Sequence, residues 1–435
     1  YDEKAYAGVA SDGKTFTIYR NGEKTETMPS DYHKHFHLRL LNRANRVTLS
    51  ASKDGKSWDE LATDIDVSGL HHNNYGGFYA LRPALLSAGK GRTTFRNFTY
   101  RNATPQEKDM AAYLMVFHQD EDHCLHAAIS RDGYTFTALN DGKPIIAGDT
   151  IADQKGIRDP HIYRGPDGGF YLAMTDLHIY AQRDGYRDTE WERDGKTYGW
   201  GNNRGLVLMK SFDLIHWTRT NIRFDQMSKE FAQIGCAWAP ETVYDPVTGR
   251  MMIYFTMRFG TEQNRLYYVY VNQDFNRIES IPQILFEYPS GASAIDGDIT
   301  PIWNEERQKM EYHLFYVAHE SGSGIKQAVS DRIDGGYRFD PRWIDFEPVA
   351  CEAPNVWKRI GEDKWVLMYD IFGINPHNFG FVETSDFVHF KNLGRFNEGV
   401  MKTTNFRSPK HGAVIHLTQE EADRLENYWN GKKQK

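Results

Sequence analysis

The chain contains little cysteine, and that scarcity limits what it can be. Among 435 residues only Cys124, Cys236 and Cys351 occur, an odd number without CxxC spacing. This pattern argues against a disulfide framework or a cysteine zinc site, and it leaves the cellular compartment open. No apolar run reaches the roughly 18 residues that a membrane-spanning helix requires. The net charge of -7 provides no basic footprint, so we expect neither nucleic acid nor an anionic membrane as partner.

Aromatic residues, by contrast, are abundant, with Trp 10, Tyr 25 and Phe 25. Strands favour such residues, which is the simpler interpretation. The alternative is a sugar-binding surface, because aromatic rings stack on the C–H faces of sugars. The sequence starts at Tyr1 without a visible leader. We expect that a segment preceded this start and that the protein is periplasmic or extracellular.

A turn motif recurs along most of the chain. A Ser or Asn followed closely by Asp comes after an apolar strand and before an aromatic residue at five places. The Asp positions are 132, 213, 274, 331 and 386, which are 81, 61, 57 and 55 residues apart. A recurrence of this length with several short strands per repeat is typical of a β-propeller, and five copies predict five blades.

The blades predict a shared central pocket. Blade openings containing Pro or Gly are expected at Asp159-Pro160, Ala239-Pro240, Asp296-Gly297, Ala353-Pro354 and, last, Ser408 to Ile415. The outer strands of the last blade must then be the earliest ones, Tyr113 to Phe117 and Leu125 to Ile129. This closure joins both ends of the propeller and hides its edges. Gln419 to Trp429 is expected to form a short capping helix.

Three acidic residues stand at these openings: Asp159, Asp296 and Glu352. We expect them at equivalent positions in three blades, where they project into the pocket. Hydrolysis of a glycosidic bond uses one protonated carboxyl group to release the leaving oxygen and one carboxylate to activate water. A third acid nearby raises the pKa of the proton donor. The simpler alternative is that each carboxylate merely caps a turn.

On these motifs, residues 110 to 420 resemble glycoside hydrolase family 43. The matching pieces are Ile157 to Pro160, Trp238 to Pro240, Ile295-Asp296, the Glu352 segment and Ser211 to Trp217. The resemblance implies that Asp159 is the general base, Asp296 the pKa modulator and Glu352 the general acid. It also implies inversion, with base and acid roughly 6.5–9.5 Å apart. Asp298 lies two residues from Asp296, so which of the two is the modulator stays open.

Residues 1–103 predict an all-β unit of their own, followed by a linker at 104–110 and the propeller at 111–435. The unit resembles the concanavalin-like β-sandwich of family 43 β-xylosidases, apparently without its first strands. Four segments carry this resemblance: Phe36 to Arg39, Ser52 to Trp58, Gly77 to Ala80 and Phe95 to Tyr100. Whether the sandwich binds glycan or supports the propeller is not determined by the sequence.

Five further residues are candidates around the pocket. Trp238 and Trp357 either stack on sugar or fill the blade interfaces, and Glu241 either faces substrate or is structural. Arg407 is expected to bind a sugar hydroxyl or to pair with a catalytic acid. The resemblance places an ion near His411, so a structural calcium in the central channel is possible; an unmetallated histidine is the alternative, because calcium prefers oxygen ligands. No cofactor is expected to be required.

These expectations together predict an exo-acting, inverting glycoside hydrolase acting on oligosaccharides or plant polysaccharides. The resemblance implies α-L-arabinofuranosidase activity first, with β-xylosidase and galactan- or galactofuranose-directed activity as alternatives. A non-catalytic carbohydrate-binding propeller is the alternative from another class. Insertions between blades, such as Tyr180 to Asn203 with Trp191 and Trp200, are expected to wall the pocket.

Overall fold

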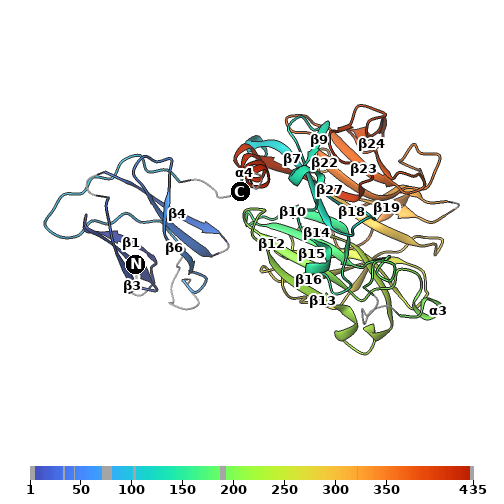
Figure 1. The fold of residues 1–435 in the computed structure, drawn as a ribbon, viewed down its shortest axis with the longest axis horizontal. Coiled ribbons are helices and arrows are strands. Elements are labelled where there is room, and N and C mark those ends of the chain that lie inside the picture. The colour runs from blue at the N-terminus through green and yellow to red at the C-terminus, as the bar shows by residue number, and fades with distance from the viewer. Residues whose placement is uncertain are drawn as a thin grey trace. The chain divides into compact units, whose positions relative to one another are not determined.

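The computed structural model describes residues 5–32, 35–43, 45–70, 81–100, 104–186, 193–320 and 322–431 (Figure 1). The chain forms two compact units, Tyr1–Pro105 and Gln106–Lys435. Among the described helices, none combines the length and the apolar character needed to cross a membrane. The two units are described separately.

The first unit contains two antiparallel three-stranded sheets. They are β1 (Gly8–Ser11), β2 (Thr15–Arg20) and β3 (Glu23–Pro29), then β4 (His37–Arg43), β5 (Arg46–Ser52) and β6 (Asp59–Asp66). Alternating residues of the two sheets share one small core, in which Ile18 packs with Val47, Leu49 and Ile65. This alternation is the pattern of strands with one buried face.

Not every strand predicted for this unit is present. Residues from Thr93 to Tyr100 form no strand, and Phe98 is 61% exposed. A strand needs a hydrogen-bonding neighbour, and the described residues provide none for this segment. The predicted strand at Gly77 to Ala80 lies outside the described residues. The likeness to a β-xylosidase sandwich therefore stays a prediction.

The second unit is a five-bladed propeller. Four blades follow one another along the chain, each an antiparallel four-stranded sheet. They are β10 (Ile157–Arg164), β11 (Phe170–Asp176), β12 (Gly205–Ser211) and β13 (Thr218–Arg223); β14 (Ile234–Asp245), β15 (Arg250–Phe259), β16 (Arg265–Val271) and β17 (Gln283–Phe286); β18 (Ala294–Asn304), β19 (Lys309–Ala318), β20 (Gly324–Ser330) and β21 (Arg338–Asp340); β22 (Glu352–Lys358), β23 (Trp365–Ile371), β24 (Asn378–Thr384) and β25 (Lys391–Arg395).

The fifth blade joins the two ends of the propeller, as predicted. Its strand order is β26 (Lys402–Thr403), β9 (Thr135–Ala138), β8 (Leu125–Ser130), β7 (Met110–His118) and β27 (Lys410–Thr418). The last strand of the chain thus pairs along the first strand of the propeller, with Val414 opposite Met115. This pairing satisfies both edges that a linear array of blades would leave open.

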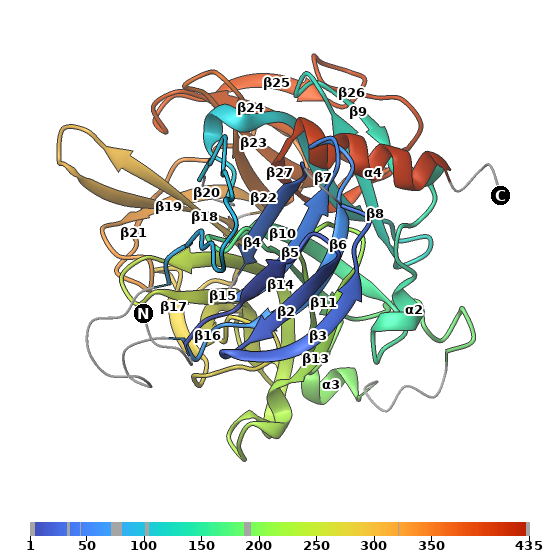
Figure 2. The ribbon, with the colours of Figure 1, turned by 90° about the vertical axis from the view of Figure 1, so that its left-hand side faces the viewer.

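The first strands of the blades meet at the centre. Contacts run from β10 to β14, β18, β22, β27 and back to β10. Figures 1 and 2 show these five strands gathered in the middle of the propeller. Hydrophobic clusters between neighbouring sheets hold the blades together; in one of them Phe224 of blade one stacks on Phe255 of blade two.

Turns and helices complete the unit. Asp132, Asp213 and Asp386 each accept backbone N–H groups two and three residues further on, which explains the motif at three of its five places. Helix α4 (Gln419–Gly431) confirms the predicted capping helix. The shorter described helices are α2 (Gly148–Ile151), α3 (Gly195–Tyr198) and the 3₁₀ turns Glu107–Asp109, Leu139–Gly142, Phe224–Gln226 and Phe231–Gln233.

Candidate active site

Each central strand carries a β-bulge near its start, and a non-glycine residue with positive φ occupies each bulge. These residues are Asp159 (φ 50), Ala239 (φ 46), Asp296 (φ 52), Ala353 (φ 57) and His411 (φ 36). Pro or Gly follows each of them. A left-handed backbone costs on the order of 1–3 kcal/mol at such residues, and this strain typically marks functional positions.

This register corrects one expectation. Asp159 and Asp296 are equivalent residues in two blades, but Glu352 lies one position earlier than its own bulge residue, Ala353. Its counterparts in the other four blades are Arg158, Trp238, Ile295 and Lys410. The sequence already contains this offset, because Pro directly follows the bulge residue in both Asp159-Pro160 and Ala353-Pro354.

Hydrogen bonds from the preceding blade hold the bulges in place. The N–H of four bulge residues donates to a side chain on the second strand of the neighbouring blade. The pairs are Asp159 to His118 Nδ1 (3.1 Å), Ala239 to Thr175 Oγ1 (2.8 Å), Asp296 to Thr256 Oγ1 (3.0 Å) and His411 to Asp370 Oδ2 (3.2 Å). The site is therefore anchored from several blades at once.

The structure brings the three predicted acids together. Asp159 Oδ2 accepts the Thr175 hydroxyl at 2.7 Å, and Asp159 Oδ1 lies 3.2 Å from His411 Nδ1. Asp296 Oδ2 accepts the N–H of Ala353 at 3.2 Å, immediately beside Glu352. The charges of Asp159 and Glu352 both act on Asp296, so the three carboxyl groups form one electrostatic unit.

The site drives the acids toward different protonation states. Burial alone would raise the pKa of Asp159, but the charges of His411 and Arg158 outweigh it and hold that pKa well below the usual range. Burial raises the pKa of Asp296; His411 opposes the rise, and the like charges of Glu352 and Asp159 add to it. Asp159 is thus a carboxylate at neutral pH, whereas Asp296 favours its protonated form.

Asp298 does not belong to this group. Its Oδ2 accepts the N–H of Val356 on β22, and burial raises its pKa to about 7. It therefore links the third blade to the fourth. His161 and Asn355 do the same work between other blades, accepting the N–H of Thr242 and Val414 at 3.1 and 2.9 Å.

Lys410 is the functional neighbour that the sequence analysis missed. Its Nζ lies 3.0 Å from Glu352 Oε1 and 3.2 Å from Asp370 Oδ2, and its side chain is only 5% exposed. Burial favours a higher pKa for Glu352, but Lys410, His411 and Arg158 together lower it. Glu352 is thus held as a carboxylate before substrate binds, the opposite of what a proton donor needs at the moment of reaction.

A second cation beside the acids is Arg158, which directly precedes Asp159. It is buried, donates to Asp120 and acts electrostatically on Asp159 and Glu352. Like Glu352, Lys410 and Arg158 each stand directly before the bulge residue of their own blade. Aligning the Pro or Gly residues that follow the five bulge residues would therefore have placed both cations level with Glu352 in the sequence.

The predicted sugar-binding residues lie in different environments. Trp238 adjoins the bulge residue Ala239 and donates from Nε1 to Gly201 O at 2.9 Å. Trp357 is 4% exposed in a hydrophobic cluster, where it contacts Phe381, so it fills the blade interface. Glu241 is also buried and accepts the Tyr254 hydroxyl at 2.7 Å, which places it within the fold. Arg407 is exposed, and its backbone oxygen accepts from Gln119 at 2.6 Å.

The fit of a metal ion at His411 can be tested from the surrounding donors. His411 Nδ1 faces Asp159. Burial acts to lower the pKa of His411, but the negative charges of Asp159, Asp296 and Glu352 outweigh burial, so the pKa is raised. A protonated imidazole does not ligate a metal. Within the described residues no group of three or more His, Cys, Asp or Glu side chains is arranged to hold a metal. A calcium ion near His411 stays a prediction, and we derive no step through one.

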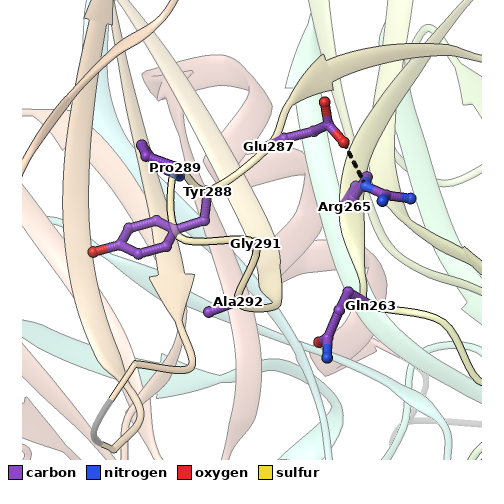
Figure 3. Close-up of a pocket in the computed structure, with 7 residues that line it drawn as sticks. All are labelled: Gln263, Arg265, Glu287, Tyr288, Pro289, Gly291 and Ala292. Atoms are coloured by element: carbon purple, nitrogen blue, oxygen red, sulfur yellow. Dashed lines mark ion pairs between the residues drawn. The ribbon is translucent and has the colours of Figure 1, made fainter.

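A cavity of about 400 Å³ lies apart from the three acids (Figure 3). Gln263, Arg265, Glu287, Tyr288, Pro289, Gly291 and Ala292 line it. Its one carboxylate, Glu287, lies 2.5 Å from Arg265 Nε, and both side chains are partly exposed. This lining contains a single carboxyl group, so it cannot supply the pair of carboxyl groups that glycoside hydrolysis requires.

A five-bladed propeller whose centre gathers three carboxyl groups of opposed acidity defines a class of carbohydrate-cleaving proteins, and the sequence comparison agrees. Residues 108–423 match the family described as "Probable glycosyl hydrolase domain", which is related to glycoside hydrolase family 43. The chain belongs to this family.

Individual proteins with named activities resemble this chain only at low sequence identity. An α-L-arabinofuranosidase of Bifidobacterium longum is 28% identical over 193 residues, which cover 42% of this chain and 16% of that protein. The chain thus spans about a sixth of that relative. Similar solved structures include an endo-arabinase from Bacteroides thetaiotaomicron (14% identity, 62% of this chain, 88% of that chain, TM-score 0.44) and the family 43 protein BlXynB from Bacillus licheniformis (15%, 69%, 55%, 0.43).

Proposed function

We propose that the protein is an exo-acting, inverting glycoside hydrolase that releases a terminal α-L-arabinofuranose from plant polysaccharide. The observation that carries this proposal is the trio Asp159, Asp296 and Glu352, three carboxyl groups in one buried site where the pKa of Asp296 is raised and the pKa values of Asp159 and Glu352 are lowered. Membership of a glycosyl hydrolase family supports the reaction class. The name of the Bifidobacterium relative supports the sugar.

In the proposed reaction, Asp159 removes a proton from water while the water oxygen attacks the anomeric carbon. The bond from that carbon to the leaving oxygen breaks on the opposite side, and Glu352 protonates that oxygen. His411 and Thr175 orient Asp159 through both of its carboxylate oxygens. Exchange with solvent then removes the proton from Asp159 and returns one to Glu352.

Glu352 must gain a proton before this step, although Lys410 favours its charged form. Its side chain is 22% exposed. A sugar over the site covers that remaining surface, and desolvation raises the pKa of a carboxyl group. Asp370 offers Lys410 a second partner at 3.2 Å, so the ammonium keeps a counterion when Glu352 becomes neutral.

The test is hydrolysis of aryl α-L-arabinofuranoside, β-D-xyloside, β-D-galactoside and β-D-galactofuranoside by the wild type, Asp159→Asn and Glu352→Gln. Turnover of one glycoside, lowered about 100-fold or more in both variants, supports the site and identifies the sugar. NMR of the first-formed anomer tests inversion. Turnover of the xyloside or a galactoside instead would replace arabinofuranose by that sugar.

The alternative from another class is a propeller that binds glycan without cleaving it. It is favoured if the wild type hydrolyses none of the four glycosides, nor arabinan or arabinoxylan, yet binds them. Tight binding by Glu352→Gln together with lost turnover would instead support catalysis. We also propose a periplasmic or extracellular location, which fits a polysaccharide substrate.

A further inference from the structure

Trp200 is an exposed aromatic residue on the insertion between β11 and β12. Its exposed fraction is 71%, well above that of Trp303 (48%) or Trp343 (44%). Single exposed apolar residues are common and need no explanation. What distinguishes Trp200 is that the backbone around it is fixed on both sides.

Two glycines and one arginine hold this backbone. Gly199 (φ +81) and Gly201 (φ +63) adopt left-handed conformations that favour glycine. A Cβ at Gly199 would lie 2.5 Å from Arg258 Nη2, and one at Gly201 would lie 3.2 Å from Trp238 Cζ2. Arg258 Nη2 also donates to the carbonyl oxygens of Tyr198 (3.0 Å) and Trp200 (2.8 Å).

The same residues connect Trp200 to the candidate active site. Its ring centroid lies 6.1 Å from that of Trp238, at an interplanar angle of 67°. Trp238 directly precedes Ala239, whose N–H donates to Thr175, and the Thr175 hydroxyl donates to Asp159. One ring contact, one peptide bond and two hydrogen bonds thus connect the exposed indole of Trp200 to Asp159, the proposed base.

Trp238 is less suited to sugar stacking than the sequence suggested. The Arg258 guanidinium lies 4.6 Å from the centroid of the Trp238 ring and occupies one of its faces. Its Nε1 donates to Gly201 O, and its ring makes a T-shaped contact with the ring of Trp200. Trp238 therefore supports Trp200, and Trp200 presents the open surface.

We propose that Trp200 is a stacking platform for a sugar of the polysaccharide next to the terminal sugar that is cleaved. The inference rests on the proposed function: an exo-acting site holds the terminal sugar at the centre, so sugars at the rim belong to the remainder of the polymer. An aromatic face suits the apolar C–H face of an uncharged sugar ring. The ligand class is a neutral, branched pentose-containing polysaccharide.

The test compares kcat/KM for arabinoxylan and branched arabinan with kcat/KM for the aryl glycoside of the same sugar, using the full chain. In Trp200→Ala the ratio of polymer to aryl glycoside should fall about fivefold to tenfold, and Trp200→Phe should keep most of it. Trp303→Ala is the matched control, because Trp303 is exposed near the opposite end of β18 from Asp296. Its ratio should stay at the wild-type value.

An unchanged ratio in Trp200→Ala would overturn the inference. So would an equal loss on both substrates accompanied by a lower melting temperature, which would make Trp200 structural. A binding assay keeps this test separate from the test of catalysis. Glu352→Gln and Glu352→Gln/Trp200→Ala are titrated with the same polymers, and weaker binding by the double variant supports the platform even if no glycoside is cleaved. Equal binding by the two variants, like a ratio that falls equally in Trp303→Ala, counts against it.

Discussion

At the residue scale, Asp296 and Asp298 have different roles although they lie two positions apart on β18. Strand alternation alone would place both on one face. The bulge between Ile295 and Asp298 breaks that alternation, so Asp296 joins Asp159 and Glu352 while Asp298 bonds to the next blade.

This contrast gives a first prediction. Asp296→Asn should lower kcat by about 100-fold with little change in stability, because an amide cannot exchange a proton and so removes a titratable carboxyl group from the catalytic site. Asp298→Asn keeps an acceptor oxygen for Val356 and should retain most activity, at a stability cost of about 1 kcal/mol. Kinetics and thermal unfolding of both variants check this; equal activity losses would contradict it.

The pair His411 and Asp159 gives a second prediction, on pH. Because His411 helps to hold the pKa of Asp159 below its usual range, Asp159 stays ionised as the pH falls. In His411→Gln that pKa should rise, so the acid limb of kcat/KM should move to higher pH. A pH profile of both proteins measures the shift, with Asp298→Asn as control. An unmoved acid limb would show that His411 does not set the charge of the base.

At the scale of elements, helix α4 secures the closing blade. Ala422 and Leu425 are buried in a cluster with residues of β7, β8 and β27. Arg164 on β10 also donates to both carboxylate oxygens of Glu421, at 2.9 and 2.5 Å. The helix thus contacts the fifth blade, where the two ends of the propeller pair, and the first blade.

A third prediction concerns the stability of this closure. Leu425→Ala should destabilise the protein by about 2–4 kcal/mol, because it opens a cavity in the cluster. Asp423→Ala on the same helix removes an exposed ion pair with Arg131 and an exposed hydrogen bond from Gln419, and it should cost less than about 1 kcal/mol. Chemical denaturation of both variants measures the difference. Similar costs would mean that the helix is held by its surface pairs.

At the scale of the whole molecule, all five blades of the propeller and all three acids lie within residues 106–435. A chain of residues 106–435 should therefore keep kcat/KM on the aryl glycoside within about twofold of the full chain, since the acids' fixed geometry sets the rate. The measurement is the same assay on both proteins, checked by circular dichroism. A folded but inactive fragment would assign the first unit a part in catalysis.

The sequence by itself determined the repeat, the number of blades, the joining of the chain ends and the acidic residues at the centre. Period, turn chemistry and hydrophobic alternation are local signals, and each survives in a single strand or turn. The prediction failed for residues Thr93 to Tyr100, which form no strand and have no pairing partner among the residues that the structure describes.

The tertiary structure decided which side chains share the centre. Bulges change the direction in which neighbouring side chains point. Asp298 and Glu241 were candidates by sequence, yet Asp298 bonds to the next blade and Glu241 is buried against Tyr254 of its own blade. Lys410, Arg158 and Asp370 come from three blades, and only the closed ring brings their charges to Glu352. The pKa values of the three acids also depend on the tertiary structure. Burial and neighbouring charges set a pKa, and no local stretch of sequence contains either of them.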